Sequence, residues 1–171
     1  MKHIVMKRFL PALALCGLIS APAWANEPQL EGVFNDWTVY SLKQSGDKSC
    51  YAVAKPQSQT PQNVNHGDVR FLVSNWKSGA AKEQPSFLAG YPLKTTRAPK
   101  ARVGSSAITM YASENEAFIE SGSDERSLVG KMRAGASMRV QAVSARGTET
   151  SYQFSLKGIT AALRKAKSAC Q

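Results

Sequence analysis

The chain has 171 residues, of which 43% are hydrophobic, 20% are charged and 8% are aromatic, with 22 basic against 12 acidic side chains. This composition is typical of a folded globular protein and excludes a disordered or collagen-like chain, and the length suits one domain. The sequence contains only two histidines, His3 and His66. A multi-histidine metal centre is therefore excluded, and we expect no cofactor.

The first 25 residues have the pattern of a secretory signal peptide. Three basic residues precede an uncharged run over 9–19, and Ala23-Trp24-Ala25 supplies the small residues that a signal peptidase reads. The uncharged run is shorter than the roughly 20 residues that a membrane anchor needs. A lipid-modified Cys16 is less favoured because the bulky Leu15 precedes it. We predict a cleaved signal peptide over 1–25, Sec-type export, and one domain over 26–171.

Export changes the interpretation of the cysteines. Cys50 and Cys170 remain after cleavage, and two cysteines in an oxidising compartment most simply pair. Two free thiols, an intermolecular bond and a reactive nucleophile stay open as alternatives. The sequence has no CxxC spacing, which argues against the last of these.

Apolar residues alternate with polar ones through most of the remaining chain, which predicts short strands. In the clearest of them Val69, Phe71 and Val73 share one face. A polar stretch over 56–65 is typical of a loop. We expect strands over 33–42, 50–54, 68–76, 86–91, 107–111, 116–120, 137–144 and 149–156.

Two helices are also predicted. Ser123 is a candidate N-cap and Gly135 a stop, with Leu128 and Met132 at helical spacing between them. A second helix begins near Ile159 and carries an apolar stripe opposite basic side chains. The pattern predicts a mainly β fold, a single antiparallel β-sandwich or partly closed barrel with a short internal helix and a C-terminal helix.

Several segments resemble, in the same order, the invasion-associated locus B family. Residues 33–39 read VFNDWTV, similar to the family's F-x-DW-x-V opening, and 132–135 read MRAG. Residues 144–150 read SARGTET, and 154–162 read FSLKGITAA, similar to its S-x-RGT-x-T and SLKG segments. Many members carry a cysteine where this chain has Tyr40, which leaves the alternatives to a Cys50–Cys170 pair open.

The resemblance implies a single-domain exported protein of Gram-negative bacteria, periplasmic or at the cell surface. It brings no accepted catalytic residue and no cofactor, so we expect no enzyme activity. The family is linked in pathogens to host-cell entry, but it also occurs in bacteria that invade nothing. Virulence is therefore the weaker expectation.

Basic residues supply the candidate binding groups. Arg146-Gly147-Thr148 could bind an anion through the guanidinium and backbone amides, or simply form a turn with Gly147 at positive φ. A second group falls within nine residues: Lys94, Arg97, Lys100 and Arg102. Such clusters attract anions. The expected partner is an anionic envelope component, glycan or protein, with peripheral membrane association or solvated basic faces as alternatives. Nucleic acid is disfavoured by export.

An enzyme is the alternative hypothesis. It would be a small hydrolase or thiol enzyme that uses His66 with Cys50 or Ser144. Against it, His66 lies between a polar loop and a strand start, where we expect a surface side chain. Trp37 is expected in the core, with Asp36 at a turn.

Overall fold

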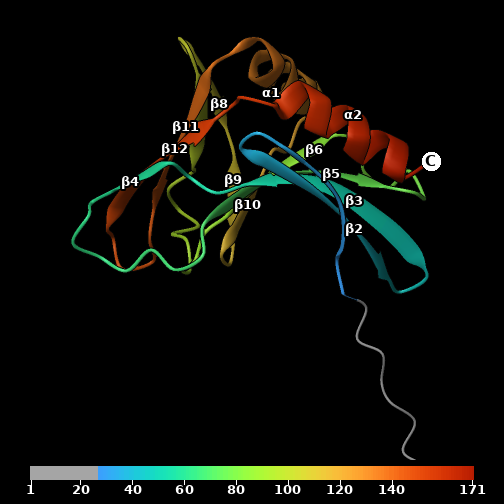
Figure 1. Ribbon diagram of the computed structural model, residues 1–171. Helices are drawn as coiled ribbons and strands as arrows, with labels where there is room; N and C mark the ends of the chain where they lie inside the picture. Colours follow the sequence, from blue (N-terminus) through green and yellow to red (C-terminus); the bar gives the residue numbers. More distant parts are fainter. Residues whose placement is uncertain (1–26) are drawn as a thin grey trace, which may run out of the picture.

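The computed structural model describes residues 27–171, which form two antiparallel sheets (Figure 1). The predicted signal peptide lies outside the described residues. The seven-stranded sheet has the order β1 (Gln29–Phe34), β2 (Trp37–Gln44), β3 (Asp47–Ala54), β5 (Arg70–Trp76), β6 (Gln84–Leu88), β10 (Glu116–Phe118), β9 (Tyr111–Ser113). The five-stranded sheet has the order β4 (Ser58–Thr60), β12 (Glu149–Ser155), β11 (Ser137–Val143), β7 (Lys100–Val103), β8 (Ser106–Thr109).

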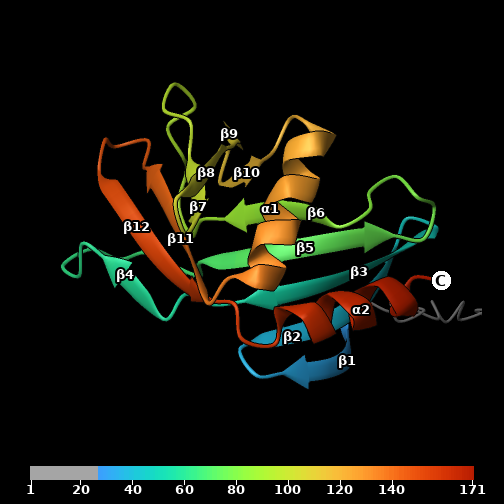
Figure 2. The ribbon, with the colours of Figure 1, turned by 90° about the horizontal axis from the view of Figure 1, so that it is seen from above.

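Two helices complete the fold, α1 (Gly122–Ala134) and α2 (Ile159–Ala169). Figure 2 shows both on the same side of the seven-stranded sheet, and α2 runs alongside β2 and β3. The prediction of a mainly β fold with an internal and a C-terminal helix is confirmed. The two sheets do not close into a barrel. None of the helices within 27–171 is long and apolar enough to cross a membrane.

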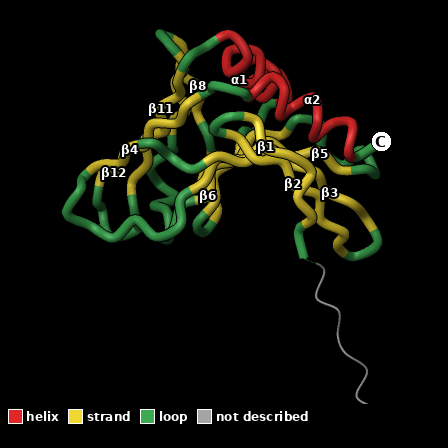
Figure 3. The backbone as a smooth tube through the Cα atoms, in the orientation of Figure 1, coloured by secondary structure: helices red, strands yellow, loops and turns green. Residues whose placement is uncertain are grey.

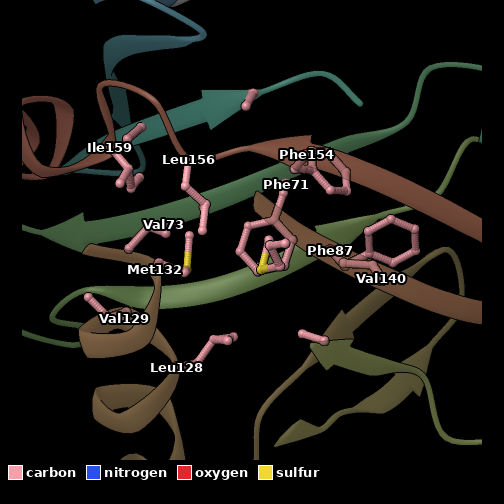
Figure 4. Close-up of a cluster of buried hydrophobic side chains, with 14 of the residues drawn as sticks. Phe71, Val73, Phe87, Leu128, Val129, Met132, Val140, Phe154, Leu156 and Ile159 are labelled. Atoms are coloured by element: carbon pink, nitrogen blue, oxygen red, sulfur yellow. The ribbon is translucent and has the colours of Figure 1, made fainter. Parts of the chain in front are cut away.

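The core lies between the two sheets and beneath the helices, because the strand alternation turns one apolar face of each sheet inward. Figure 4 shows Phe71 of β5 and Phe154 of β12 meeting there, with ring centroids 5.8 Å apart. Met132 of α1 reaches the same cluster and is fully buried. The shared face predicted for Val69, Phe71 and Val73 is buried, as expected.

The structure divides the strands more finely than the sequence predicts. Asn35 has a φ of +52° and breaks the predicted strand over 33–42 into β1 and β2. The predicted loop over 56–65 contains β4, three exposed residues paired with the edge of β12. β7 was also missed, because charged residues alternate with only two buried ones, Ala101 and Val103. The remaining connections are loops and turns (Figure 3).

Candidate functional site

The first and last motif segments of the sequence meet in the structure. Trp37 is fully buried, as predicted, and its Nε1 donates a hydrogen bond of 2.9 Å to the backbone oxygen of Ser155. The backbone N–H of Asp36 donates to the Lys157 oxygen at 3.4 Å. Gly158 follows with a φ of +92°, against the Phe34 backbone. These motifs therefore join the two ends of the domain and have a structural role.

The Arg146-Gly147-Thr148 segment forms the turn between β11 and β12. Gly147 has a φ of +90°, and its N–H donates to the Ser144 oxygen at 2.8 Å. The Thr148 N–H donates to Ser144 Oγ at 3.1 Å. The turn interpretation is confirmed. Within the described residues the exposed Arg146 side chain has no ion pair, which leaves its guanidinium available for a ligand.

A pocket of about 440 Å³ lies beside this turn. Three stretches remote in sequence line it: residues 64–66 before β5, Tyr91-Pro92 after β6, and the turn region from Ser144 to Thr150. The volume falls within the range of small-molecule sites. Arg146 and Thr148 were predicted from the sequence as binding candidates. Their association with Tyr91 and Asn65 was not predicted, because only the tertiary fold brings these segments together.

His66 lies in the wall of this pocket and corrects the expectation of a surface histidine, since only 2% of the residue is exposed. Its burial is possible because both ring nitrogens have partners. Nε2 lies 2.7 Å from the Pro61 carbonyl oxygen, which can only accept, so Nε2 carries a proton. Nδ1 lies 2.7 Å from the Tyr152 hydroxyl.

The hydrogen-bonded chain continues along the wall from Tyr152. The Tyr91 hydroxyl lies 2.8 Å from that of Tyr152 and 2.7 Å from Thr150 Oγ1, and Thr150 donates to the Ala142 oxygen at 3.1 Å. Both ends of this chain are acceptor-only carbonyls. Burial, followed by the Tyr91 hydroxyl, raises the pKa of the Tyr152 phenol.

The pairings required by the enzyme hypothesis do not occur. Ser144 and His66 line the same pocket, but Pro61 and Tyr152 occupy the ring nitrogens and Ser144 Oγ accepts from Thr148. Cys50 is fully buried in a disulfide with Cys170. Among residues 27–171, no group of three His, Cys, Asp or Glu side chains could hold a metal ion.

The second candidate surface is the outer face of the five-stranded sheet. Lys100 and Arg102 of β7 point to solvent, while Ala101 and Val103 between them are buried. The register places Arg139 of β11 directly beside Arg102. Two rows of side chains therefore cross all five strands: Thr109, Lys100, Gln141, Ser151 and Thr60, and Ala107, Arg102, Arg139, Gln153 and Ser58. We call this surface the basic face.

The other two residues of the predicted cluster lie beside the basic face rather than on it. Arg97 and Lys100 line a groove of about 490 Å³, and Arg97 lies 3.7 Å from Glu149. Lys94 is exposed, and its backbone N–H donates to the Val143 oxygen at 2.8 Å. The structure thus brings Lys100 and Arg102 together with Arg139, which the sequence analysis missed. Arg139 lies within a predicted strand, but its neighbour on β7 depends on strand register.

The basic face is electrostatically unusual. Like charges directly opposite on neighbouring strands destabilise a sheet, and Arg102 faces Arg139 in this way. Arg139 reaches only the neutral Gln153 Oε1, at 3.3 Å. None of Lys100, Arg102 and Arg139 has an acidic partner in the described part of the chain. Three cations therefore remain available on one surface of the sheet.

Comparison with known proteins gives a family for the chain. The family model described as "Invasion associated locus B (IalB) protein" matches residues 37–167. No curated protein and no solved structure gives a significant match. The matched region contains both candidate surfaces and most of the motif segments that carried the resemblance, from Trp37 onward. The chain belongs to the invasion associated locus B (IalB) family.

Proposed function

We propose that the protein is an exported, non-enzymatic binding domain, periplasmic or at the cell surface of a Gram-negative bacterium. Its basic face holds an anionic component of the envelope or of a host cell. The observation that carries this proposal is the set of Lys100, Arg102 and Arg139, adjacent on one face and without carboxylate partners among the described residues. The family name further suggests a contribution to host-cell invasion, which in this proposal depends on such binding.

The other side chains of the basic face favour an acidic glycan as the ligand. Apart from Ala107, the residues of the two rows around the cations are Ser, Thr and Gln, which can hydrogen-bond hydroxyl groups. The exposed large apolar residues of the described chain are Leu30, Val33, Val64 and Tyr111, and none belongs to these rows. The face therefore lacks the apolar side chains that insert into a lipid surface, and lipopolysaccharide sugars and phosphates match it better.

Binding to purified lipopolysaccharide tests the proposal. The variant carrying Lys100→Gln, Arg102→Gln and Arg139→Gln should bind about 100-fold more weakly at low salt, from about 1 kcal/mol per basic residue near an anionic surface. The matched control carries Lys157→Gln, Arg164→Gln and Lys167→Gln, which removes the same charge from exposed residues outside the two rows and should bind normally. Wild-type affinity should fall as salt rises.

Equal weakening by the two triple variants would show that net charge, not the basic face, determines binding. An affinity that is independent of salt would also contradict the proposal. The Ser144→Ala variant examines the enzyme alternative, since a hydrolase that uses this hydroxyl would lose its activity. Export is tested separately by the intact mass of protein from an exporting host, which should correspond to a chain that starts at Asn26.

A further inference from the structure

We propose that the pocket beside the β11–β12 turn is a second, distinct binding site and that it takes a sugar acid, with the carboxylate held at Arg146. The inference rests on the proposed function in one respect, that the natural ligand is an acidic glycan. The basic face would hold the body of such a polymer, and the pocket would hold a single carboxylate-bearing sugar residue. The basic face and the pocket use different cations, so they can be tested apart.

The polar groups of the pocket favour an anion. Arg146 is the only permanently charged side chain in its lining, which includes no Asp or Glu. Asn65 accepts a hydrogen bond from the Gly67 N–H through Oδ1, at 2.9 Å, so its amide nitrogen remains as the donor that it can offer a ligand. The Thr148 hydroxyl makes no hydrogen bond within the described chain. A guanidinium with neutral donors beside it is suited to a carboxylate.

The rest of the lining is suited to a sugar ring. Val64, Pro92 and Ala145 supply apolar contacts, and the Tyr91 side chain adds an aromatic one. The hydroxyls of Ser144 and Thr148 can exchange hydrogen bonds with ring hydroxyls. At about 440 Å³ the pocket has room for a monosaccharide. A small inorganic anion would leave the apolar part of the pocket unused.

The pocket wall is held rigid before any ligand arrives. The Tyr91 hydroxyl lies between those of Tyr152 and Thr150, at 2.8 and 2.7 Å, and the chain is anchored at both ends on backbone carbonyls. His66, Tyr152 and Thr150 are all buried. Such preorganisation reduces the entropy lost on binding.

The pocket also adjoins the basic face. Thr150 lines both the pocket and the groove that contains Arg97 and Lys100. Ser144 lines the pocket, and the preceding residue, Val143, lines the groove. The pocket and the groove therefore share one lining residue, Thr150.

The test is calorimetric titration of the full-length mature protein with galacturonate, with galactose as the neutral control ligand. Wild-type protein should bind galacturonate at least about tenfold more tightly than galactose, the size expected for a charge-assisted hydrogen-bonded pair. Arg146→Gln should abolish this preference. Arg164→Gln, an equal charge change on the exposed face of α2, should retain it. Thr148→Val, which removes the hydroxyl but keeps the shape of the side chain, should weaken the binding of galacturonate.

Three results would overturn the inference: no binding of galacturonate, equal binding of galactose, or unchanged preference in Arg146→Gln. The basic-face triple variant separates the two proposals. If it loses lipopolysaccharide but still binds galacturonate, both proposals stand. If Arg146→Gln retains galacturonate while the triple variant loses lipopolysaccharide, the pocket proposal fails and the basic-face proposal survives.

Discussion

At the scale of single residues, the first and last family motifs pack against each other and fix the backbone where the two ends of the domain meet. Gly158 of the SLKG segment adopts a left-handed conformation, with a φ of +92°. A Cβ atom at this position would overlap the carbonyl oxygen of Phe34. Two and three residues after Phe34, the Asp36 backbone and the buried Trp37 side chain form their bonds to the backbone oxygens of Lys157 and Ser155. Glycine is therefore required both by the backbone conformation and by the space.

We expect Gly158→Ala to destabilise the protein by more than about 2 kcal/mol, since left-handed backbone alone costs an L-residue about 1–2 kcal/mol. Urea unfolding measures this loss. Gly130→Ala is the matched control, because Gly130 lies on the exposed side of α1 with no atom near its missing Cβ. Alanine there should be neutral or stabilising by up to about 1 kcal/mol. Equal effects of the two substitutions would contradict the structural role of the motif.

The buried chain of His66, Tyr152, Tyr91 and Thr150 gives a second prediction for single residues. Tyr152→Phe removes the hydroxyl that joins His66 Nδ1 to Tyr91 and leaves both groups without that partner. Unfolding free energy at pH 7 should fall by about 1–3 kcal/mol. Tyr111→Phe, at a residue that is 49% exposed, should change it by less than about 0.5 kcal/mol.

The same phenol predicts a pH dependence. Burial raises the pKa of Tyr152 above its ordinary value of 10.0, so the folded protein keeps a proton that the unfolded chain releases above about pH 10. The contribution of Tyr152 to the unfolding free energy is then fully present below that pH and falls as the pH rises further. The fall should be less steep in Tyr152→Phe. Tyr51, whose pKa burial also raises, leaves a residual slope in both proteins. Parallel curves would show that Tyr152 does not contribute.

At the scale of elements, a charged cluster fastens α2 to the outermost strand of the seven-stranded sheet. Glu31 of β1 accepts a hydrogen bond from the Ser41 hydroxyl at 2.9 Å. Its carboxylate lies 3.1 Å from Lys165 Nζ of α2 and 3.8 Å from Lys48 Nζ of β3. The Ser41 hydrogen bond and then Lys165 lower the pKa of Glu31. The edge strand β1 and α2 are thus coupled through one side chain.

Glu31→Gln should destabilise the protein at pH 7 by no more than about 1 kcal/mol, because the pairs are partly exposed to solvent. A lowered carboxyl pKa adds stability above the ordinary value of 4.5 and loses it as pH falls through the folded value. The difference in unfolding free energy between wild type and Glu31→Gln should therefore become smaller as the pH is lowered. The exposed Glu120→Gln is the control and should show no such trend. A difference that is constant with pH would contradict the role of the carboxylate.

Elements were predicted well from the sequence where apolar and polar residues alternate strongly or where apolar residues recur at helical spacing. They were predicted poorly where a strand forms only because it pairs with a neighbouring strand. The buried stripe of α1 and the alternation of β5 depend on side chains of the element itself, so they could be read directly. β4 has three exposed polar residues and exists only because β12 offers its edge. No local pattern can indicate such a strand, because its free energy comes from a distant partner.

At the scale of the whole molecule, the candidate site was harder to predict from the sequence than the elements, because it also depends on partners that are distant in the chain. Lys100 and Arg102 could be selected from charge clustering and Arg146 from its Arg-Gly-Thr segment. Arg139 joined Lys100 and Arg102 only through the pairing of β7 with β11. The pocket needs three loops that meet at one end of the sheets. His66 was expected at the surface because its segment is polar, yet partners 5 and 86 residues away satisfy its ring and bury it.

The disulfide is the longest-range covalent constraint on the molecule. Cys50 lies in β3, an interior strand of the seven-stranded sheet, and Cys170 follows the last turn of α2. Their Cα–Cα distance is 5.7 Å and their sequence separation is 120. It therefore holds the end of the chain, and with it α2, against the sheet. Closing so long a loop restricts the unfolded chain far more than the folded one.

We expect reduction to lower the free energy of unfolding by about 4–5 kcal/mol. Urea unfolding of the oxidised and reduced protein measures this, with a mass gain of about two daltons verifying reduction. The Cys50→Ala/Cys170→Ala variant should match the reduced protein and be insensitive to reductant, which separates loss of the bond from other effects of the reagent. Since α2 also packs through Ile159, Leu163 and Ala166, the reduced protein should retain its helix signal in the absence of urea. Equal unfolding midpoints for oxidised and reduced protein would show that packing alone holds α2, and that the bridge does not contribute to stability.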